Sequence, residues 1–375
     1  MFGPASCFES RLRKVGSHEP SWNARFVRCV RGFSRIRSSK ISPTHSRSNL
    51  ATVVALLTVS AAVSLNAQFL RAVPSTDPKV VRRWSLPGDP HGLALGADGT
   101  IYVGLAEPQA IVAIDPKNGA MKRKVVLDSA DIASTKELVT LRTDRSRLRL
   151  FVANGSDESV TILSLPTLRI VREITIEGEP IRDALPDPTG RFLYLLGRRV
   201  HVYDINGKSE LRTIRFDDPI AIAASGSMLA VFGRDVVAFY NAGSFEEIGR
   251  DPFRSQVAAA LFAANDKVLV ALSRDSLYEK SLTLRATGSS ERICLPEGSG
   301  PQIATLAAPD LLLFAERRCN SSGGFAGSNR LVAPASLYGV NAYAIAYDPA
   351  PNFLYVTERA GYLTIYRVPR AAVVK

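Results

Sequence analysis

The chain is poor in histidine and cysteine, the residue types that most often build catalytic and metal sites. Its 375 residues include four of each. No H-E-x-x-H, C-x-x-C or C-x-x-C-H motif occurs, so the sequence does not support a zinc site or covalently attached haem. The nucleophile motif G-x-S-x-G, the Walker phosphate-binding loop and the dinucleotide-binding fingerprint are also absent. We therefore assign no catalytic residue, no metal ligand and no cofactor from the sequence.

The body of the chain also lacks a large excess of either charge. The net charge of +12 is concentrated at one end, because residues 1–67 contain ten Lys or Arg and two Glu. The remaining 308 residues contain 37 basic and 33 acidic residues. A nucleic-acid-binding domain usually carries a basic patch or stripe on its surface. Because the body is only mildly basic, we do not expect nucleic acid as a partner.

One long apolar run stands out near the N-terminus. Residues 50–67 read LATVVALLTVSAAVSLNA and contain no charged residue. A basic stretch from Arg35 to Arg47 precedes the run and the small residue Ala67 ends it, which is the pattern of a cleaved export signal. The alternative is an uncleaved membrane anchor, although a span needs about 20 apolar residues. Both interpretations predict an exported protein, periplasmic or extracellular, and it meets a membrane only through this segment if the segment is uncleaved.

The apolar run divides the chain into four parts. Residues 1–49 form a basic leader without hydrophobic periodicity, which we expect to be disordered. Residues 50–67 are the signal or anchor, residues 68–78 are interpreted as a linker, and residues 79–375 are interpreted as the folded domain. We expect this domain to be a monomer.

The cysteines divide in the same way. Cys7 and Cys29 lie in the leader, whereas Cys294 and Cys319 lie in the folded domain. A pair of cysteines in an exported chain is a candidate disulfide. Two separate buried thiols are the alternative.

A short apolar pattern, often with an aromatic residue, recurs seven times in the folded domain. The copies are IYVG at 101, LFVA at 150, LYLL at 193, LAVF at 229, VLVA at 268, LLLF at 311 and LYVT at 354. A small apolar segment precedes each copy, and a turn and one or two further alternating segments follow it. Four short strands in each repeat of about 42 residues are typical of a β-propeller blade. Because no long amphipathic helix pattern interrupts the repeats, we predict an all-β, seven-bladed propeller.

The two ends of the folded domain are predicted to share one blade. The last repeat has three strands, and few residues remain after it for a fourth. The segment KVVRRWSLPGDP at 79–90 resembles RIVREITIEGEP at 169–180, which is a fourth strand that leads into the next blade. An unpaired edge would expose backbone hydrogen-bonding groups. We therefore predict that residues 79–86 pair antiparallel with LTIYRV, residues 363–368, and close the last blade.

The repeats resemble a known family. The clearest copies are LYVTERAGYLTIYRV, LFVANGSDESVTIL and IYVGLAEPQAIVAID, which resemble the YVTN-type β-propeller repeat over residues 79–375. This resemblance implies a seven-bladed architecture, related to that of WD40-like repeats and commonly exported. Similar propellers include ligand-binding surface proteins, lactonases and carriers of redox cofactors, so the resemblance does not choose a function. No residue is carried over as catalytic, because the shared motif is structural.

Polar residues gather where the innermost strands are predicted to begin. The junction GDPHGLAL recurs as GEPIRDAL, DDPIAIA and SGPQIATL. In a propeller these junctions surround one mouth of the central channel, where convergent loops often bind ligands. Alternatively, the same side chains pair with each other and bridge the blades. The candidate binding residues are His91, Glu137, Arg142, Arg182, Asp183, Gln302, Asn341 and Tyr343.

These observations predict a binding or scaffold module that presents the channel mouth to a small ligand or to a protein of the cell envelope. The alternative is a lactonase-type hydrolase with a polar or metal site in the channel. Three or more carboxylate, Asn or His side chains within metal-ligand distance would favour the hydrolase. Side chains that pair with each other would favour binding or scaffolding. Enzymatic activity is left open, and binding is the favoured interpretation.

Overall fold

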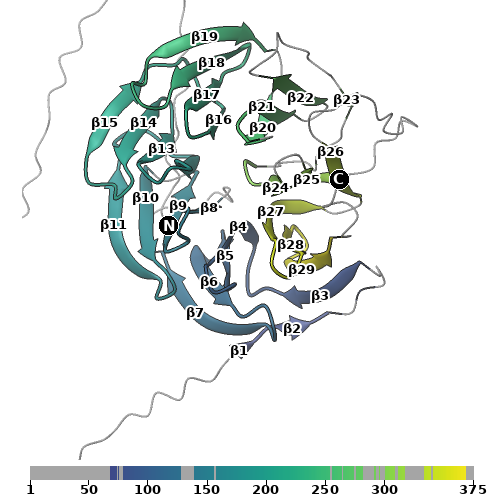
Figure 1. Cartoon of the computed structure of the whole chain (residues 1–375). Coiled ribbons are helices and arrows are strands. Elements are labelled where there is room, and N and C mark those ends of the chain that lie inside the picture. Colours follow the sequence, from purple (N-terminus) through teal and green to yellow (C-terminus); the bar gives the residue numbers. More distant parts are fainter. Residues whose placement is uncertain are drawn as a thin grey trace, which may run out of the picture. The chain divides into compact units, whose positions relative to one another are not determined.

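The structure is a computed structural model of the chain, and it describes most residues from 68 onward (Figure 1). The described residues are 68–73, 75, 79–127, 139–155, 158–253, 256–263, 265–273, 276–281, 291–292, 295, 300–308, 311–316, 333–338 and 341–368. They form β-strands joined by turns, and no helix occurs among them. This part of the chain therefore has no helix that is long and apolar enough to cross a membrane.

The described strands are organised in seven sheets, and the first four are antiparallel. The first sheet contains β1 (Gln68–Phe69), β4 (Pro90–Leu95), β5 (Ile101–Leu105), β6 (Ala110–Ile114) and β7 (Ala120–Val126) in the order β1-β7-β6-β5-β4. The second contains β8 (Val139–Thr143), β9 (Arg149–Asn154), β10 (Ser159–Ser164) and β11 (Arg169–Thr175). The third contains β12 (Asp183–Pro186), β13 (Phe192–Leu196), β14 (Val200–Asp204) and β15 (Glu210–Ile214). The fourth contains β16 (Ala221–Ala224), β17 (Met228–Phe232), β18 (Val236–Asn241) and β19 (Glu247–Pro252).

The remaining three sheets follow the same strand order with local differences. The fifth contains β20 (Val257–Ala263), β21 (Val268–Ser273), β22 (Ser276–Ser281) and β23 (Glu291–Arg292). The sixth contains β24 (Ala304–Ala308), β25 (Leu311–Glu316) and β26 (Ala333–Tyr338). The seventh contains β2 (Arg71–Ala72), β3 (Val80–Ser85), β27 (Ala342–Asp348), β28 (Phe353–Glu358) and β29 (Tyr362–Arg367) in the order β2-β3-β29-β28-β27. The predicted all-β class is therefore confirmed for the described residues.

The sixth sheet differs from the others in its strand direction. Its third strand, β26, pairs parallel with β25 and places Leu313 opposite Ala335. Parallel strands cannot be joined by a tight hairpin and need a longer crossover connection. The residues between the two strands, 317–332, lie outside the described part of the chain.

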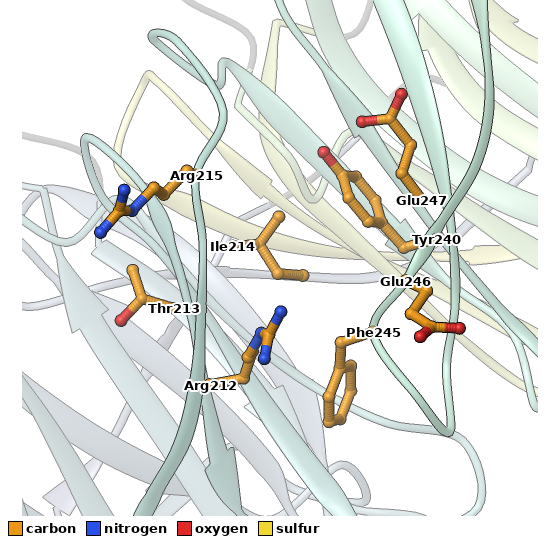
Figure 2. Close-up of a pocket in the computed structure, with 8 residues that line it drawn as sticks. All are labelled: Arg212, Thr213, Ile214, Arg215, Tyr240, Phe245, Glu246 and Glu247. Atoms are coloured by element: carbon orange, nitrogen blue, oxygen red, sulfur yellow. The ribbon is translucent and has the colours of Figure 1, made fainter.

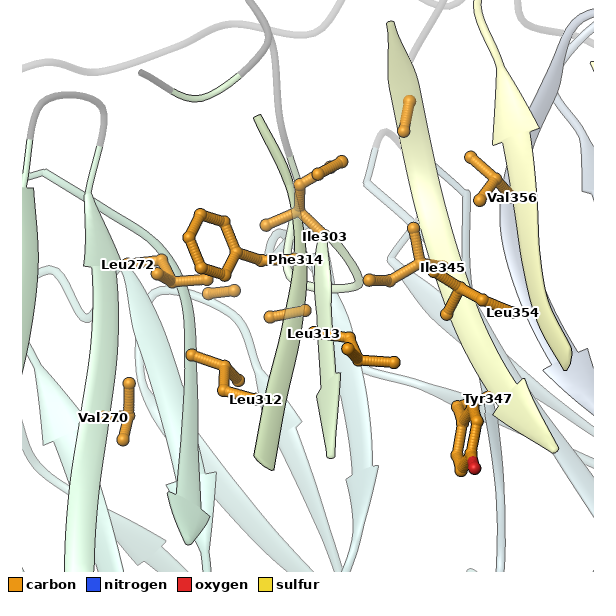
Figure 3. Close-up of a cluster of buried hydrophobic side chains, with 14 of the residues drawn as sticks. Val270, Leu272, Ile303, Leu312, Leu313, Phe314, Ile345, Tyr347, Leu354 and Val356 are labelled. Atoms are coloured by element: carbon orange, nitrogen blue, oxygen red, sulfur yellow. The ribbon is translucent and has the colours of Figure 1, made fainter. Parts of the chain in front are cut away.

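Burial depends on the position of each strand in its sheet. The middle strands, such as β5 and β6, are buried along their whole length, whereas outer strands such as β7 and β11 are mostly exposed. Apolar side chains of neighbouring sheets form the core between them. Figure 3 shows one such cluster, in which Leu272, Phe314 and Ile345 come from the fifth, sixth and seventh sheets. The middle strands are apolar on both faces because each sheet packs against a neighbour on either side.

The first strands of successive sheets contact one another. The contacts run from β4 to β8, β12, β16, β20, β24 and β27, and then from β27 back to β4. These first strands are also rich in small residues, as in AIAA of β16. Small side chains allow neighbouring backbones to approach closely.

The predicted pairing of the two ends of the folded domain is confirmed. Strand β3 pairs antiparallel with β29, with Trp84 opposite Leu363 and Arg82 opposite Ile365. Trp84 is buried, and its indole fills the space beside Gly119, where an added Cβ would lie 2.8 Å from the ring. Gly119 also has a φ of 72°, so both space and backbone conformation favour glycine there.

Two short strands were not expected in the segment interpreted as a linker. Strand β1 pairs with β7, with Phe69 opposite Ala120, and β2 pairs with β3, with Ala72 opposite Trp84. Between them, the backbone N–H of Leu70 donates to the carbonyl oxygen of Gly119 at 3.0 Å. Residues 68–72 therefore extend the outer edges of the first and seventh sheets (Figure 1), and this part of the predicted linker belongs to the folded domain.

Candidate functional site

Seven of the eight candidate residues are described, and they lie in or next to the first strands of their sheets. They are His91 in β4, Arg142 in β8, Arg182 and Asp183 at β12, Gln302 before β24, and Asn341 and Tyr343 at β27. Glu137 and the candidate disulfide cysteines Cys294 and Cys319 lie outside the described residues. The seven residues separate into groups that differ in how completely their hydrogen bonds are satisfied.

Gln302 bridges three sheets with its side-chain amide. Its Oε1 accepts hydrogen bonds from the backbone N–H groups of Leu93 and Leu141, at 3.4 and 2.9 Å. Its Nε2 donates to the carbonyl oxygens of the same two residues, at 2.8 and 2.5 Å. Since a side-chain amide offers two donors and about two acceptor positions, all of its capacity is used within the protein. Gln302 is 6% exposed and joins the sixth sheet to β4 and β8.

Arg142 and Asp183 form a second bridge beside it. The Arg142 guanidinium donates to both carboxylate oxygens of Asp183, from Nε at 3.2 Å and from Nη2 at 3.0 Å. Nη2 also donates to the carbonyl oxygen of Pro301 at 3.1 Å, next to Gln302. Asp183 is 1% exposed, and a buried carboxylate needs such partners to remain charged. We call Gln302, Arg142 and Asp183 the Gln302 cluster.

Within the described part of the chain, Arg182 has no hydrogen bond or ion pair with its neighbour Asp183 and binds backbone carbonyl groups instead. Its guanidinium donates to the carbonyl oxygens of Gly197, at 2.7 Å, and Pro219. Burial lowers the pKa of the guanidinium, while the nearby Asp218 and Glu179 act in the opposite direction. Arg182 thus joins the loop after β13 to the start of the fourth sheet, and its contacts are structural.

A different group forms around His91 and Tyr343. The two rings lie with their centroids 4.1 Å apart and their planes tilted by 31°. The His91 ring is 2% exposed, and its Nε2 lies 3.3 Å from the carboxylate of Asp89. The hydroxyl of Thr357 donates to the backbone carbonyl of His91 at 2.7 Å, which attaches β4 to β28 of the seventh sheet.

Arg359 completes this group from the turn after β28. Its guanidinium lies over the Tyr343 ring, 4.4 Å from the centroid, in a cation–π contact. Its backbone N–H donates to the carbonyl oxygen of Asn341 at 2.9 Å. The side-chain atoms Nε and Nη2 are buried, and neither has a hydrogen-bond partner in the described part of the chain. We call Asp89, His91, Tyr343 and Arg359 the Arg359 cluster.

The Arg359 cluster combines groups of opposite charge with the neutral hydroxyl of Tyr343. Burial raises the pKa of the Tyr343 hydroxyl, and the charge of Asp89 adds to the effect, while Arg359 opposes it. Tyr343 is therefore a neutral donor at neutral pH. The cluster offers one permanent cation, one carboxylate, one imidazole and one phenol within a small region.

Asp89 and Arg359 were not among the residues selected from the sequence. Asp89 stands in the junction GDPHGLAL, and the same place is acidic in GEP and DDP, as Glu179 and Asp218. This recurrence was a usable signal. The sequence gives no comparable signal for Arg359, because a basic residue in a turn between two strands is usually a solvated surface residue. Asn341, which was selected, is exposed and contributes only its backbone.

His201 has carboxylate partners on both sides of its ring. Its Nδ1 lies 2.9 Å from Glu210 and its Nε2 lies 3.3 Å from Glu179. Burial alone would raise the pKa of the Glu210 carboxyl, but hydrogen bonds from Thr213 and His201 outweigh it and hold the pKa below its usual value. Among the described residues, no group of three or more His, Cys, Asp or Glu side chains could hold a metal ion.

A groove lies away from these clusters, between the third and fourth sheets. It has a cavity volume of about 710 Å³, and Figure 2 shows its lining residues. Arg212 and Arg215 come from one wall, and Glu246 and Glu247 from the other, with Ile214, Tyr240 and Phe245 between the walls. The opposite charges balance, and the residue types do not indicate a particular ligand.

No protein-family model matches this chain, and none of the curated proteins matches it significantly.

Proposed function

We propose that the chain is an exported seven-bladed β-propeller that binds a small ligand carrying a carboxylate at the Arg359 cluster. The propeller is supported by the seven sheets and by the contacts of their first strands, which return from β27 to β4. The pairing of β3 with β29 supports a last blade shared by the two ends of the domain. In this architecture the Arg359 cluster lies at the end of the channel where the innermost strands begin.

The observation that carries the ligand proposal is the pair of buried, unpartnered N–H groups of Arg359. A buried donor without a partner costs about 1–3 kcal/mol, so native proteins rarely keep one without a reason. Nε and Nη2 of arginine point in parallel and match the two oxygens of a carboxylate. The contact with Tyr343 holds the guanidinium in place, which reduces the entropy lost when a ligand binds.

The neighbouring groups restrict the ligand further. Tyr343 can donate from its hydroxyl, and its ring together with His91 offers an apolar, stackable surface. Asp89 adds a negative charge close to the same rings, which disfavours ligands with a second negative charge. We therefore expect a planar monocarboxylate to bind better than a dianion.

A titration with benzoate and its neutral analogue benzamide tests this proposal. We expect benzoate, and not benzamide, to raise the melting temperature of the protein and to give a measurable heat of binding. Arg359→Gln should weaken benzoate binding about tenfold or more, because a charge-assisted hydrogen bond contributes about 1.5–3 kcal/mol. Arg367→Gln is the control, because Arg367 also lies over an aromatic ring, that of Phe353. Equal binding of benzoate by the two variants would contradict the proposal.

The hydrolase alternative is favoured by one specific observation, the contact between Asp89 and His91. A carboxylate that orients an imidazole is the arrangement that hydrolases use for general base catalysis. In that case Arg359 would stabilise the oxyanion formed when water attacks a lactone. Hydrolysis of γ-butyrolactone that is lost in His91→Asn, together with retained folding, would establish this alternative.

Export is supported by the basic stretch and the apolar run of residues 50–67. N-terminal sequencing of the protein secreted by its own cells tests it. A mature chain that begins at Gln68 is expected, and a chain that retains residues 50–67 would indicate an anchor.

A further inference from the structure

The outer strands next to the N-terminal segment carry an unusual charge. Residues 68–73, 79–85 and 115–126 include β1, β2, β3 and β7, and they contain eight Lys or Arg and one acidic residue, Asp115. The outer strands of the next three sheets, β11, β15 and β19, contain four basic and four acidic residues. The basic charge is therefore concentrated on the outer edges of the first and seventh sheets, which we call the basic rim.

Four cationic side chains of the basic rim are exposed and form no hydrogen bond or ion pair with other described residues. Arg71, Lys117, Arg123 and Lys124 have no side-chain hydrogen bond or ion pair among the described residues. Other cations of these segments do have partners. Arg83 pairs with Glu358 at 2.7 Å, and Lys122 lies 3.8 Å from Asp115. The four unpartnered cations thus leave an uncompensated positive surface.

Large apolar side chains are exposed on the rim, as they also are on the outer strands β11, β15 and β19, and only on the rim do they lie beside unbalanced positive charge. Phe69 of β1 is 63% exposed and Val126 of β7 is 55% exposed. Cations combined with exposed apolar residues are typical of surfaces that lie on a lipid bilayer, where apolar groups enter the interface and cations meet the headgroups.

The position of the rim in the chain indicates which anionic surface it meets. Its first residue, Gln68, directly follows the apolar run of residues 50–67. No linker separates that run from β1, and β1 and β2 are paired onto β7 and β3. If the run is retained as an anchor, the chain between its last residue and the rim is too short to hold the rim far from the membrane, since one residue spans about 3.5 Å at most.

We propose that the basic rim, represented by Arg71, Lys117, Arg123 and Lys124, docks on the anionic headgroups of a lipid bilayer. This docking is independent of the ligand proposed for the Arg359 cluster, which lies at other strands. It orients the domain with the first and seventh sheets toward the membrane and leaves the third to fifth sheets directed away from it. The attraction is electrostatic, so it weakens as the salt concentration rises.

Vesicle flotation of the full chain tests the proposal. Vesicles of phosphatidylcholine alone are compared with vesicles that also contain phosphatidylglycerol. Insertion of the apolar run contributes to binding to both kinds of vesicle, so the difference in binding reports the effect of the anionic headgroups. We expect the wild-type chain to prefer the anionic vesicles by about tenfold or more at low salt, and the preference to fall in 0.5 M NaCl. The basic residues of the leader, residues 1–49, contribute to this preference in every variant, so the quadruple variant Arg71→Gln, Lys117→Gln, Arg123→Gln, Lys124→Gln should reduce the preference about threefold or more without abolishing it.

A second quadruple variant with the same net charge is the control. Arg145→Gln, Arg169→Gln, Arg172→Gln and Arg212→Gln remove four exposed cations from the second and third sheets. This variant should keep the preference for anionic vesicles, and both variants should keep the wild-type circular dichroism spectrum. The proposal is overturned if the two variants lose the preference equally, if the wild-type chain shows no preference, or if the rim variant loses binding to duplex DNA and keeps binding to vesicles.

Discussion

The Gln302 cluster and the Arg359 cluster are built from similar residues at similar places in their sheets. They differ in whether their buried polar groups have hydrogen-bond partners. Gln302 uses all of its amide capacity on Leu93 and Leu141, and its neighbour Asp183 receives two hydrogen bonds from Arg142. Arg359 keeps two buried N–H groups without partners. Burial alone therefore does not distinguish a structural polar residue from a binding residue. An unmet buried donor is a cost that a ligand can remove, so the completeness of its hydrogen bonds is the property that the following predictions test.

The comparison predicts a large loss of stability when the Gln302 bridge is removed. Gln302→Leu keeps a side chain of similar size but leaves the backbone N–H and carbonyl groups of Leu93 and Leu141 without the amide. Unmet buried polar groups cost about 1–3 kcal/mol each, so we expect a loss of about 3 kcal/mol or more in the free energy of unfolding. Urea denaturation followed by circular dichroism measures it.

The matched control is Gln256→Leu, which makes the same chemical change at an exposed glutamine. It should alter the free energy of unfolding by less than about 0.5 kcal/mol. Equal effects of the two substitutions would show that the four hydrogen bonds of Gln302 do not bridge the sheets in solution.

A smaller effect is expected at Glu210, whose contacts are also satisfied. Its pKa is held below the usual value, so its carboxylate stabilises the fold above the unfolded-state pKa, near 4.5. That contribution is lost as the pH falls through the lower folded-state pKa. Since the side chain of Glu210 is 37% exposed, solvent screening limits the contribution to about 0.5–1 kcal/mol.

Thermal unfolding of Glu210→Gln from pH 7 to pH 3 measures this contribution. The variant should be less stable than the wild type at pH 7, and the difference should shrink as the pH falls below about 4. Glu173→Gln on the exposed strand β11 is the control and should follow the wild type at every pH. A difference that grows toward acid pH would mean that the carboxylate is not stabilised in the folded state.

Much of the fold could be predicted from the sequence, because strand patterns and the matching ends are local signals. The seven apolar copies all lie in strands, and the pairing of residues 79–86 with the C-terminal strand follows from the likeness of two segments. The parallel strand β26 and the pairings of β1 and β2 were missed. Very short strands have little periodicity, and a parallel pairing depends on a crossover rather than on the strand itself.

The sequence selected some residues of the two clusters and missed others. His91 and Tyr343 were selected from separate repeats, and the structure places their rings in contact. Gln302 was selected by the same reasoning and proved to be a fully bonded bridge. Arg359 was missed because its role depends on what lies beside it in space, and no sequence pattern reports which of its hydrogen bonds are unmet.

The last prediction concerns Arg359 itself, where the expected effect on stability is smallest. Arg359→Met removes a cation–π contact of about 0.5–1 kcal/mol but also removes the two unpartnered N–H groups, whose burial costs a similar amount or more. We therefore expect the free energy of unfolding to stay within about 0.5 kcal/mol of the wild type or to rise slightly. The same substitution at Arg142 breaks the paired contact with the buried Asp183 and should cost about 2–3 kcal/mol. The arginine-to-methionine substitution should therefore be almost neutral at Arg359 and clearly destabilising at Arg142. Equal losses of stability in the two variants would mean that Arg359 is as fully bonded as Arg142, and the reason for placing a ligand at the Arg359 cluster would disappear.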